Sequence, residues 1–179
     1  MAVVDHLAAG GCRRLVHIAG PEANIDARER LRGTREACAR LGVELRVLQG
    51  DFNEDSGTAA VATLQAERTE YDAIFDANDM MAVGALMALK RAGVAVPEQV
   101  AVAGFDNIPL TRLISPALTT ASIDIAEFGA RAVVRLAGLI DGAADEILEW
   151  RAPIVIARES TRHPTENTTE NPIRREDRE

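Results

Sequence analysis

Residues 73–86 read AIFDANDMMAVGAL, and their order gives the clearest indication of the fold. A short apolar strand (73–75) runs into a polar turn (76–79), and an apolar helix follows at once, which is the order of a strand–turn–helix unit. Similar strand ends precede Gly20-Pro21, Gly50-Asp51 and Gly104-Phe105-Asp106-Asn107. Repeated units of this kind build a parallel sheet with the turns after the strands at one edge, where such sheets bind ligands. The sequence therefore predicts an α/β fold with a binding edge.

The side chains at that edge are carboxylates, an amide and an aromatic ring, with no evident pairing of nucleophile and base. Such groups suit the binding of a small polyhydroxyl molecule better than its chemical conversion. The chain is therefore not expected to be an enzyme.

Bulk composition narrows the class further. The 179 residues suffice for one well-buried domain, alone or with a fragment of a second. A net charge of −8 and the lack of a clustered basic face argue against a nucleic-acid footprint on this chain. No long apolar run resembles an export signal or a membrane span, so we expect a cytoplasmic protein without a membrane partner.

Cys12 and Cys38 are the only cysteines, and their spacing fits no zinc or redox motif. We expect them to pack as small apolar residues. No cofactor and no metal site are predicted.

Glycines and short polar side chains mark the ends of the early predicted helices. The expected ends are Gly10 for a helix over 2–9, Asp26 and Gly42 for the second helix, and Asp55 or Ser56 for the start of a helix over about 54–66.

The helix from Met80 to Leu89 is apolar at almost every position, with Asp79 as its expected cap and Gly93 as its end. A helix that is apolar on all sides is buried on all sides. In a chain of this size, that pattern predicts a partner subunit in addition to the sheet. We therefore expect a homodimer.

The last third of the chain is less regular. A helix is predicted over about 126–139, with a core face formed by Phe128, Ala132, Leu136 and Leu139. A bent strand or strand pair is expected over 147–156, around Pro153. Residues 163–179 are polar and are predicted to be disordered.

Several motifs, which together span about residues 6–162, resemble the effector-binding core of LacI/GalR-type transcriptional regulators. The most specific are A-N-D-x-x-A-x-G at 77–84 and G-F-D-x-x-P at 104–109, in this order. The others are Gly20-Pro21, the segment Arg28–Gly33, Gly50-Asp51-Phe52, the segment Pro116–Thr120 and the segment Arg158–Thr161.

This resemblance implies a periplasmic-binding-protein-like core of two three-layer α/β subdomains. Effector is held in the cleft between them, and a helix-turn-helix headpiece precedes them. The chain is similar to the C-terminal part of such a core, so DNA would be contacted only through a headpiece absent from this chain. The resemblance implies these parts: 1–11 and 121–147 as remnants of the first subdomain, 12–120 as the complete second subdomain, 148–162 as a return strand, and 163–179 as the tail. The two remnants would expose apolar faces unless a second copy covers them.

The resemblance also assigns the site. Asn78 and Asp106 correspond to hydroxyl-binding residues, Arg30 to an arginine of the site, and Phe52 to an aromatic that packs near a sugar ring. Their chemistry agrees, because a carboxylate, an amide and a guanidinium can together pair adjacent hydroxyls. Asp26, Asp51 and Asp76 are additional candidates for ligand binding, while Asp79 is expected to cap its helix. The predicted partner is a small carbohydrate-like effector.

Two other functions remain open. A periplasmic sugar-binding protein for transport would share the fold, although the missing export signal and the apolar helix 80–89 disfavour it. A Mg²⁺-dependent phosphoryl-transfer enzyme could use Asp51, Asp76, Asp79 and Asp106 as ligands. The chain has no G-x-x-x-x-G-K loop to hold phosphate, which disfavours the enzyme.

Overall fold

The computed structural model describes residues 1–142 and 152–162 and contains a six-stranded sheet in the order β2-β1-β3-β4-β5-β6. Strands β1 to β5 pair in parallel, and β6 is antiparallel to β5. The strands are β1 (Arg14–Ala19), β2 (Glu44–Gln49), β3 (Ala73–Asp76), β4 (Ala101–Phe105), β5 (Thr119–Ser122) and β6 (Ile154–Ile156). The helices are α1 (Ala2–Ala9), α2 (Ile25–Leu41), α3 (Glu54–Ala66), α4 (Asp79–Arg91) and α5 (Ile125–Ile140), with a 3₁₀ turn at Pro109–Arg112.

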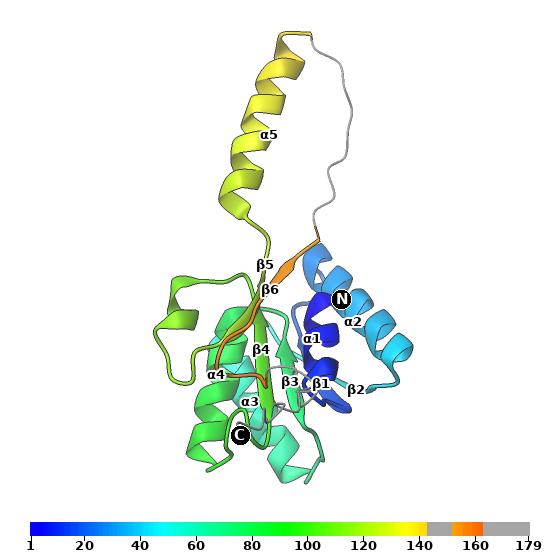
Figure 1. Ribbon diagram of the computed structural model, residues 1–179, viewed down its shortest axis with the longest axis vertical. Helices are drawn as coiled ribbons and strands as arrows, with labels where there is room; N and C mark the ends of the chain where they lie inside the picture. The colour runs from blue at the N-terminus through cyan, green and yellow to red at the C-terminus, as the bar shows by residue number, and fades with distance from the viewer. Residues whose placement is uncertain (143–151, 163–179) are drawn as a thin grey trace, which may run out of the picture.

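Helices cover both faces of this sheet, with α1 and α2 on one face and α3 and α4 on the other (Figure 1). Side chains alternate along each strand, so Ile74 joins the core under α3 and α4 while Phe75 joins the core under α1 and α2. The predicted three-layer α/β fold is confirmed.

Three helix starts differ from the sequence prediction. Asn24, rather than Asp26, caps α2, and its Oδ1 accepts a hydrogen bond from the Ala27 amide at 2.9 Å. Asn78, rather than Asp79, caps α4 through the Met81 amide at 3.0 Å. Helix α3 begins after Asn53 without a side-chain cap, so the expected caps Asp55 and Ser56 lie inside the helix. In each case an asparagine one to three residues earlier occupies the extended conformation that a cap requires.

Helix α1 does not form an exposed remnant, contrary to the expectation for residues 1–11. Its apolar residues Val3, Val4 and Leu7 are buried against Cys38 and other residues of the second core. Its His6 Nε2 also lies 2.7 Å from Thr161 Oγ1. The segment therefore packs beside α2 on the unit that follows it.

The apolar surface of α4, which was expected to need a partner subunit, is mostly covered by other parts of the same chain. The sheet covers one side of α4 and α3 covers another, at a backbone separation that only glycine permits. A Cβ at Gly84 would lie 1.9 Å from the Glu54 carbonyl oxygen, and one at Gly57 would lie 2.0 Å from that of Met81. Only Met80, Val83, Met87 and Ala88 among the apolar side chains of α4 remain half-buried.

Helix α5 forms over Ile125–Ile140, close to the predicted range, but none of its residues is buried. It extends away from the rest of the molecule (Figure 1). The apolar face that was expected to belong to a core is therefore exposed. This agrees with the expectation that the segment 121–147 exposes an apolar face in this chain. The start of the predicted strand at 147–151 and the predicted tail at 163–179 lie outside the described residues. Within the described part of the chain, no helix is both long and apolar enough to cross a bilayer.

Candidate functional site

A pocket of about 190 Å³ opens at the carboxyl edge of the parallel strands. Its lining consists of Asn24, Asp26, Arg30, Phe52, Asn78 and Asp106. The four principal candidates from the sequence thus gather in one place, together with the additional candidate Asp26. Asn24 is a pocket residue that the sequence reasoning missed, although a short amide immediately before a helix is a recognisable cap signal.

The parallel sheet explains why these residues meet. Phe52 follows β2, Asn78 follows β3 and Asp106 follows β4, so three strand ends deliver them to the same edge. Helix α2 contributes Asn24, its N-cap, and Arg30, which lies in its second turn. Segments far apart in sequence therefore contribute to one concave surface.

Arg30 is held in place by three neighbours. Its Nη2 lies 3.3 Å from Asp106 Oδ1, its Nη1 donates to the Ala77 carbonyl, and its guanidinium carbon lies 3.8 Å above the centre of the Phe105 ring. Burial raises the pKa of Asp106, and the positive charge of Arg30 opposes that rise. The ion pair therefore fixes both side chains before a ligand arrives.

Asn78 joins a helix cap to the pocket wall. Its Oδ1 accepts a hydrogen bond from the Met81 amide, and its Nδ2 donates one to the Phe52 carbonyl at 2.9 Å. Phe52 in turn adopts a φ of 72°, and Asp106 a φ of 111°. Strained backbone of this kind in non-glycine residues concentrates at ligand-binding sites. Both residues belong to this pocket.

Asp51 and Asp76, two of the additional candidates, do not line the pocket. Asp51 is exposed, and its Oδ1 accepts the Asn53 amide at 2.9 Å in the turn before α3, which lowers its pKa. Asp76 pairs in register with Ile18 and is fully buried on the side of α3 and α4. Neither of its carboxyl oxygens has a hydrogen-bond partner within residues 1–142 and 152–162, and burial, with the nearby charge of Asp79, raises its pKa.

Asp79 has a structural role that the sequence did not reveal. Its carboxylate accepts hydrogen bonds from Thr120 Oγ1 at 2.6 Å and from the Ile108 amide at 2.9 Å. Gly104 leaves the space for this approach, since a Cβ there would lie 2.3 Å from Asp79 Oδ1. Burial raises the pKa of Asp79 to about 6. The residue fastens α4 to the loop that presents Asp106.

Among residues 1–142 and 152–162, no group of three or more acidic, histidine or cysteine side chains is placed to hold a metal ion. The four aspartates proposed for Mg²⁺ have different surroundings: Asp51 is exposed, Asp76 is enclosed, Asp79 accepts a hydrogen bond from Thr120 and Asp106 is paired with Arg30. The described part of the chain therefore offers no ligand set for the magnesium alternative.

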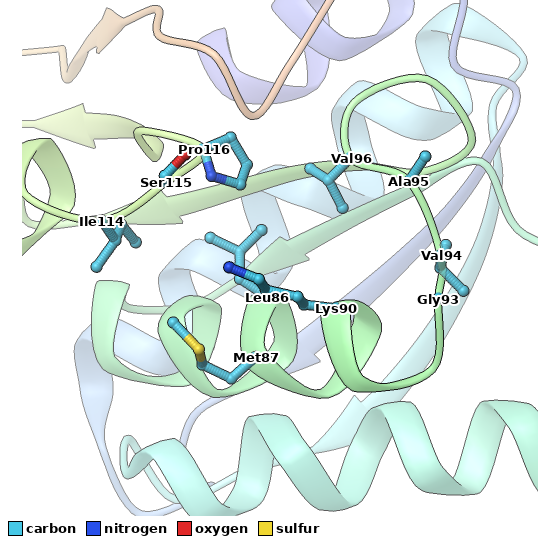
Figure 2. A pocket seen from close by; sticks show the side chains of 10 residues that line it. All are labelled: Leu86, Met87, Lys90, Gly93, Val94, Ala95, Val96, Ile114, Ser115 and Pro116. Atoms are coloured by element: carbon cyan, nitrogen blue, oxygen red, sulfur yellow. The ribbon is translucent and has the colours of Figure 1, made fainter.

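A second cavity, of about 220 Å³, lies at the opposite end of α4. Figure 2 shows it between the C-terminal part of α4 and the loops that carry Val96 and Pro116. Its lining is mainly apolar, with Lys90 and Ser115 as its polar side chains. The α4 residues of this cavity, Leu86 to Lys90, lie about 12–18 Å along the helix from Asn78 of the first pocket.

Comparisons with known proteins agree with this architecture. A family model described as a periplasmic binding protein-like domain matches residues 4–161. The HTH-type transcriptional regulator CelR of Thermobifida fusca is 38% identical over 142 residues, which make up 78% of this chain and 41% of that protein. The chain therefore spans less than half the length of this curated relative.

Two solved structures extend the similarity to three dimensions. A dimeric Lac repressor with an 11-residue C-terminal deletion superimposes with a TM-score of 0.86 at 29% identity, over 91% of this chain and 60% of that one. A complex of the regulator CelR with cellobiose gives a TM-score of 0.80 at 34% identity, over 89% and 50%. The family model matches most of the chain, and the chain's relatives are transcriptional regulators. The chain therefore belongs to the periplasmic binding protein-like family and corresponds to the effector-binding core of LacI-type transcriptional regulators.

Proposed function

We propose that this chain binds a small carbohydrate-like effector as part of a LacI-type transcriptional regulator that works in the cytoplasm. The observation that carries the proposal is the pocket formed by Arg30, Phe52, Asn78 and Asp106 with Asn24 and Asp26. Contact with DNA falls to a headpiece outside these residues. The chain acts as a binding module and not as an enzyme.

The chemistry of the pocket supports a polyhydroxyl ligand. Asp106 can accept hydrogen bonds from two adjacent hydroxyl groups, while Asn78 and Asn24 offer amide donors. Phe52 provides an apolar face for the C–H groups of a ring. The related regulator CelR has been solved with cellobiose, which is a molecule of this class.

The mechanism we propose is a shift between two arrangements of the regulator. An effector alters such an equilibrium only if it binds one arrangement more tightly than the other. The ion pair of Arg30 and Asp106 gives the pocket one fixed side. A ligand bound to this side can draw the facing side of the regulator's cleft toward it.

A second copy of the chain is the proposed partner, and the half-buried side of α4 beside the second cavity is the proposed contact. Leu113 is 77% exposed next to Ile114 of that cavity, and Met87 is half-buried beside it. The Lac repressor neighbour is dimeric. In sedimentation velocity, Leu113→Lys should dissociate the dimer, whereas Val134→Lys on the remote α5 should leave it intact. Dimers that survive Leu113→Lys would contradict this contact.

Thermal unfolding across a panel of pentoses, hexoses and disaccharides, at concentrations up to 100 mM, tests effector binding. A ligand at one hundred times its dissociation constant stabilises the folded state by about 2.7 kcal/mol. We expect one or more sugars to raise the melting temperature of the unaltered chain. Asp106→Asn should abolish the rise, because asparagine tolerates a positive φ but removes the charge that pairs with Arg30.

Asp51→Asn is the matched control, since it removes one negative charge from an exposed position outside the pocket and keeps the turn before α3. It should respond to sugars as the unaltered chain does. An unaltered chain that unfolds cooperatively and responds to none of these sugars would contradict the proposed function.

A further inference from the structure

We infer that this pocket selects uncharged or positively charged polyhydroxyl ligands and rejects phosphorylated or carboxylated ones, an inference that rests on the proposed function. It follows from four features of the pocket: its balance of charge, the partners of its arginine, the caps of two helix ends, and the hydrogen-bond acceptors that remain without a donor.

The charge balance of the lining is negative. Asp26, Arg30 and Asp106 are its charged side chains. Arg30 and Asp106 form an ion pair at 3.3 Å, so their charges largely offset each other. Asp26 forms no hydrogen bond and no ion pair with any residue that the structure describes, and its charge acts on Asp106. The lining therefore presents one uncompensated carboxylate to a ligand.

Arg30, the one positive charge among the described residues of the lining, already has partners within the protein. Binding of a phosphate or carboxylate by arginine uses the parallel N–H groups of a free guanidinium. Here Nη1 of Arg30 donates to the Ala77 carbonyl, Nη2 donates to Asp106, and the plane stacks on Phe105. These contacts use two of the five guanidinium N–H groups, and a ligand anion would have to share the charge of the guanidinium with the Asp106 carboxylate.

Two helix N-termini open at the pocket, and such ends ordinarily attract anions. In this chain each is capped by an asparagine: Asn24 Oδ1 accepts a hydrogen bond from the Ala27 amide, and Asn78 Oδ1 accepts one from the Met81 amide. Each helix also carries an aspartate in its first turn, Asp26 in α2 and Asp79 in α4. The partial positive charge of each end is therefore reduced by groups of the protein itself.

The remaining hydrogen-bonding capacity favours ligands rich in donors. The carboxylate of Asp26 and the second oxygen of Asp106 have no hydrogen-bond donor among the described residues. Hydroxyl and ammonium groups can supply such donors, whereas phosphate and carboxylate groups add acceptors. Neutral sugars and amino sugars satisfy this demand.

Matched sugar derivatives test the inference. We would measure the dissociation constants of glucose, glucosamine, glucose 1-phosphate and glucose 6-phosphate, and of the corresponding galactose derivatives, together with ribose and ribose 5-phosphate. Isothermal titration at 20 mM and 200 mM salt gives the constants. For the ring that binds best, we expect the phosphates to bind about tenfold or more weakly than the neutral sugar. The amino sugar should bind at least as tightly as the neutral one, and the difference should shrink at high salt.

Asp26→Asn keeps the shape of the side chain and removes its charge. It should narrow the gap between the neutral sugar and its phosphates by about three- to tenfold. Asp51→Asn, the matched change outside the pocket, should leave that gap unaltered.

The possible failures are distinguishable. If a sugar phosphate binds more tightly than its neutral parent, the charge selection is overturned while effector binding stands. If Asp26→Asn and Asp51→Asn change the gap equally, the selection does not arise from the pocket charge and the inference fails. If no sugar of any charge binds, the proposed function itself fails, and this inference fails with it.

Discussion

Helices α4 and α5 have similar apolar character and opposite surroundings. Helix α4 buries seven of its 13 residues between the sheet and α3, whereas α5 buries none of its 16. Exposed apolar side chains on α5 include Phe128, Val134 and Leu136. An apolar helix pattern therefore predicts how much of the helix surface has to be covered, but it does not predict which element covers that surface.

The contrast also bears on function. Helix α4 places Asn78 at the pocket and reaches the second cavity at its other end, so a well-packed helix joins the two surfaces. Helix α5 projects from the body (Figure 1) and contributes no residue to either cavity. Variants that act differently on the two helices therefore test whether this division of roles is correct.

The largest expected difference comes from removing matched leucines. Leu89 of α4 is fully buried, while Leu136 of α5 is 59% exposed. Leu89→Ala should lower the free energy of unfolding by about 2–5 kcal/mol. Leu136→Ala should change it by no more than about 0.5 kcal/mol. Urea denaturation followed by circular dichroism measures both. Equal losses from the two variants would mean that α5 is buried in solution.

Matched glycines sharpen the comparison. A Cβ at Gly84 meets the Glu54 backbone, whereas one at Gly129 of α5 meets nothing within 4 Å. Gly84→Ala should destabilise the chain by about 1–3 kcal/mol, because α3 and α4 must separate. Gly129→Ala should be neutral or stabilise by up to about 1 kcal/mol, because alanine favours a helix. A Gly84→Ala chain as stable as the unaltered one would contradict the close approach of α3 and α4.

The pH dependence of stability distinguishes the surroundings of the two helix starts. Burial raises the pKa of Asp76, just before α4, so the folded state keeps its proton after the unfolded chain has lost it. Its contribution to stability is therefore complete below about pH 4 and falls as pH rises. Asp76→Asn has no such dependence. Its urea midpoint should match that of the unaltered chain at pH 4 and exceed it at pH 7.5.

Asp124→Asn, at the exposed cap of α5, is the control for that measurement. The Asp124 carboxylate accepts the Glu127 amide at 2.9 Å, and asparagine caps helices about as well. The variant should differ little from the unaltered chain at either pH. An Asp76→Asn midpoint that is lower at pH 7.5 would show that the Asp76 carboxyl has a partner in solution.

The smallest effect on folding is expected from a charge on α5. Val134 is 74% exposed, so Val134→Lys should change the free energy of unfolding by no more than about 0.5 kcal/mol. The same change interrupts an exposed apolar surface, so it should leave the dimer intact and reduce the concentration-dependent association of dimers into larger species. Light scattering between about 10 and 300 µM measures it. Unchanged scattering would mean that α5 is not the surface responsible.

Part of the site could be predicted from the order of strands alone. Asn78 and Asp106 directly follow strands, and parallel strands end at one edge, so their meeting was foreseeable. Arg30 and Phe52 were identified only through the family resemblance, because a helix surface and a loop leave the direction of a side chain open. Asp76 also ends a strand, yet it faces the core. The alternation along β3 places it on the side of Ile74, and sequence alone did not reveal how many strand residues precede the turn.

The capping residues show the same limit on a shorter scale. Asp79 and Asn78 are adjacent, and either could cap α4 by residue type. The choice was made by Thr120 and the Ile108 amide, which come from distant segments and engage the Asp79 carboxylate. Local propensity cannot include partners that lie about 30 or 40 residues away in the chain.

The α/β class, the order of the strands and helices, and the family could all be predicted from the sequence, because apolar periodicity and two ordered motifs are local properties of the chain. The tertiary structure alone decided that α1 is buried while α5 is exposed, that Asp26 lines the pocket while Asp51 and Asp76 do not, and that Arg30 is already paired. These outcomes depend on which surfaces meet after the sheet forms. Burial and pairing are properties of two surfaces together, and one segment of sequence describes only one of them.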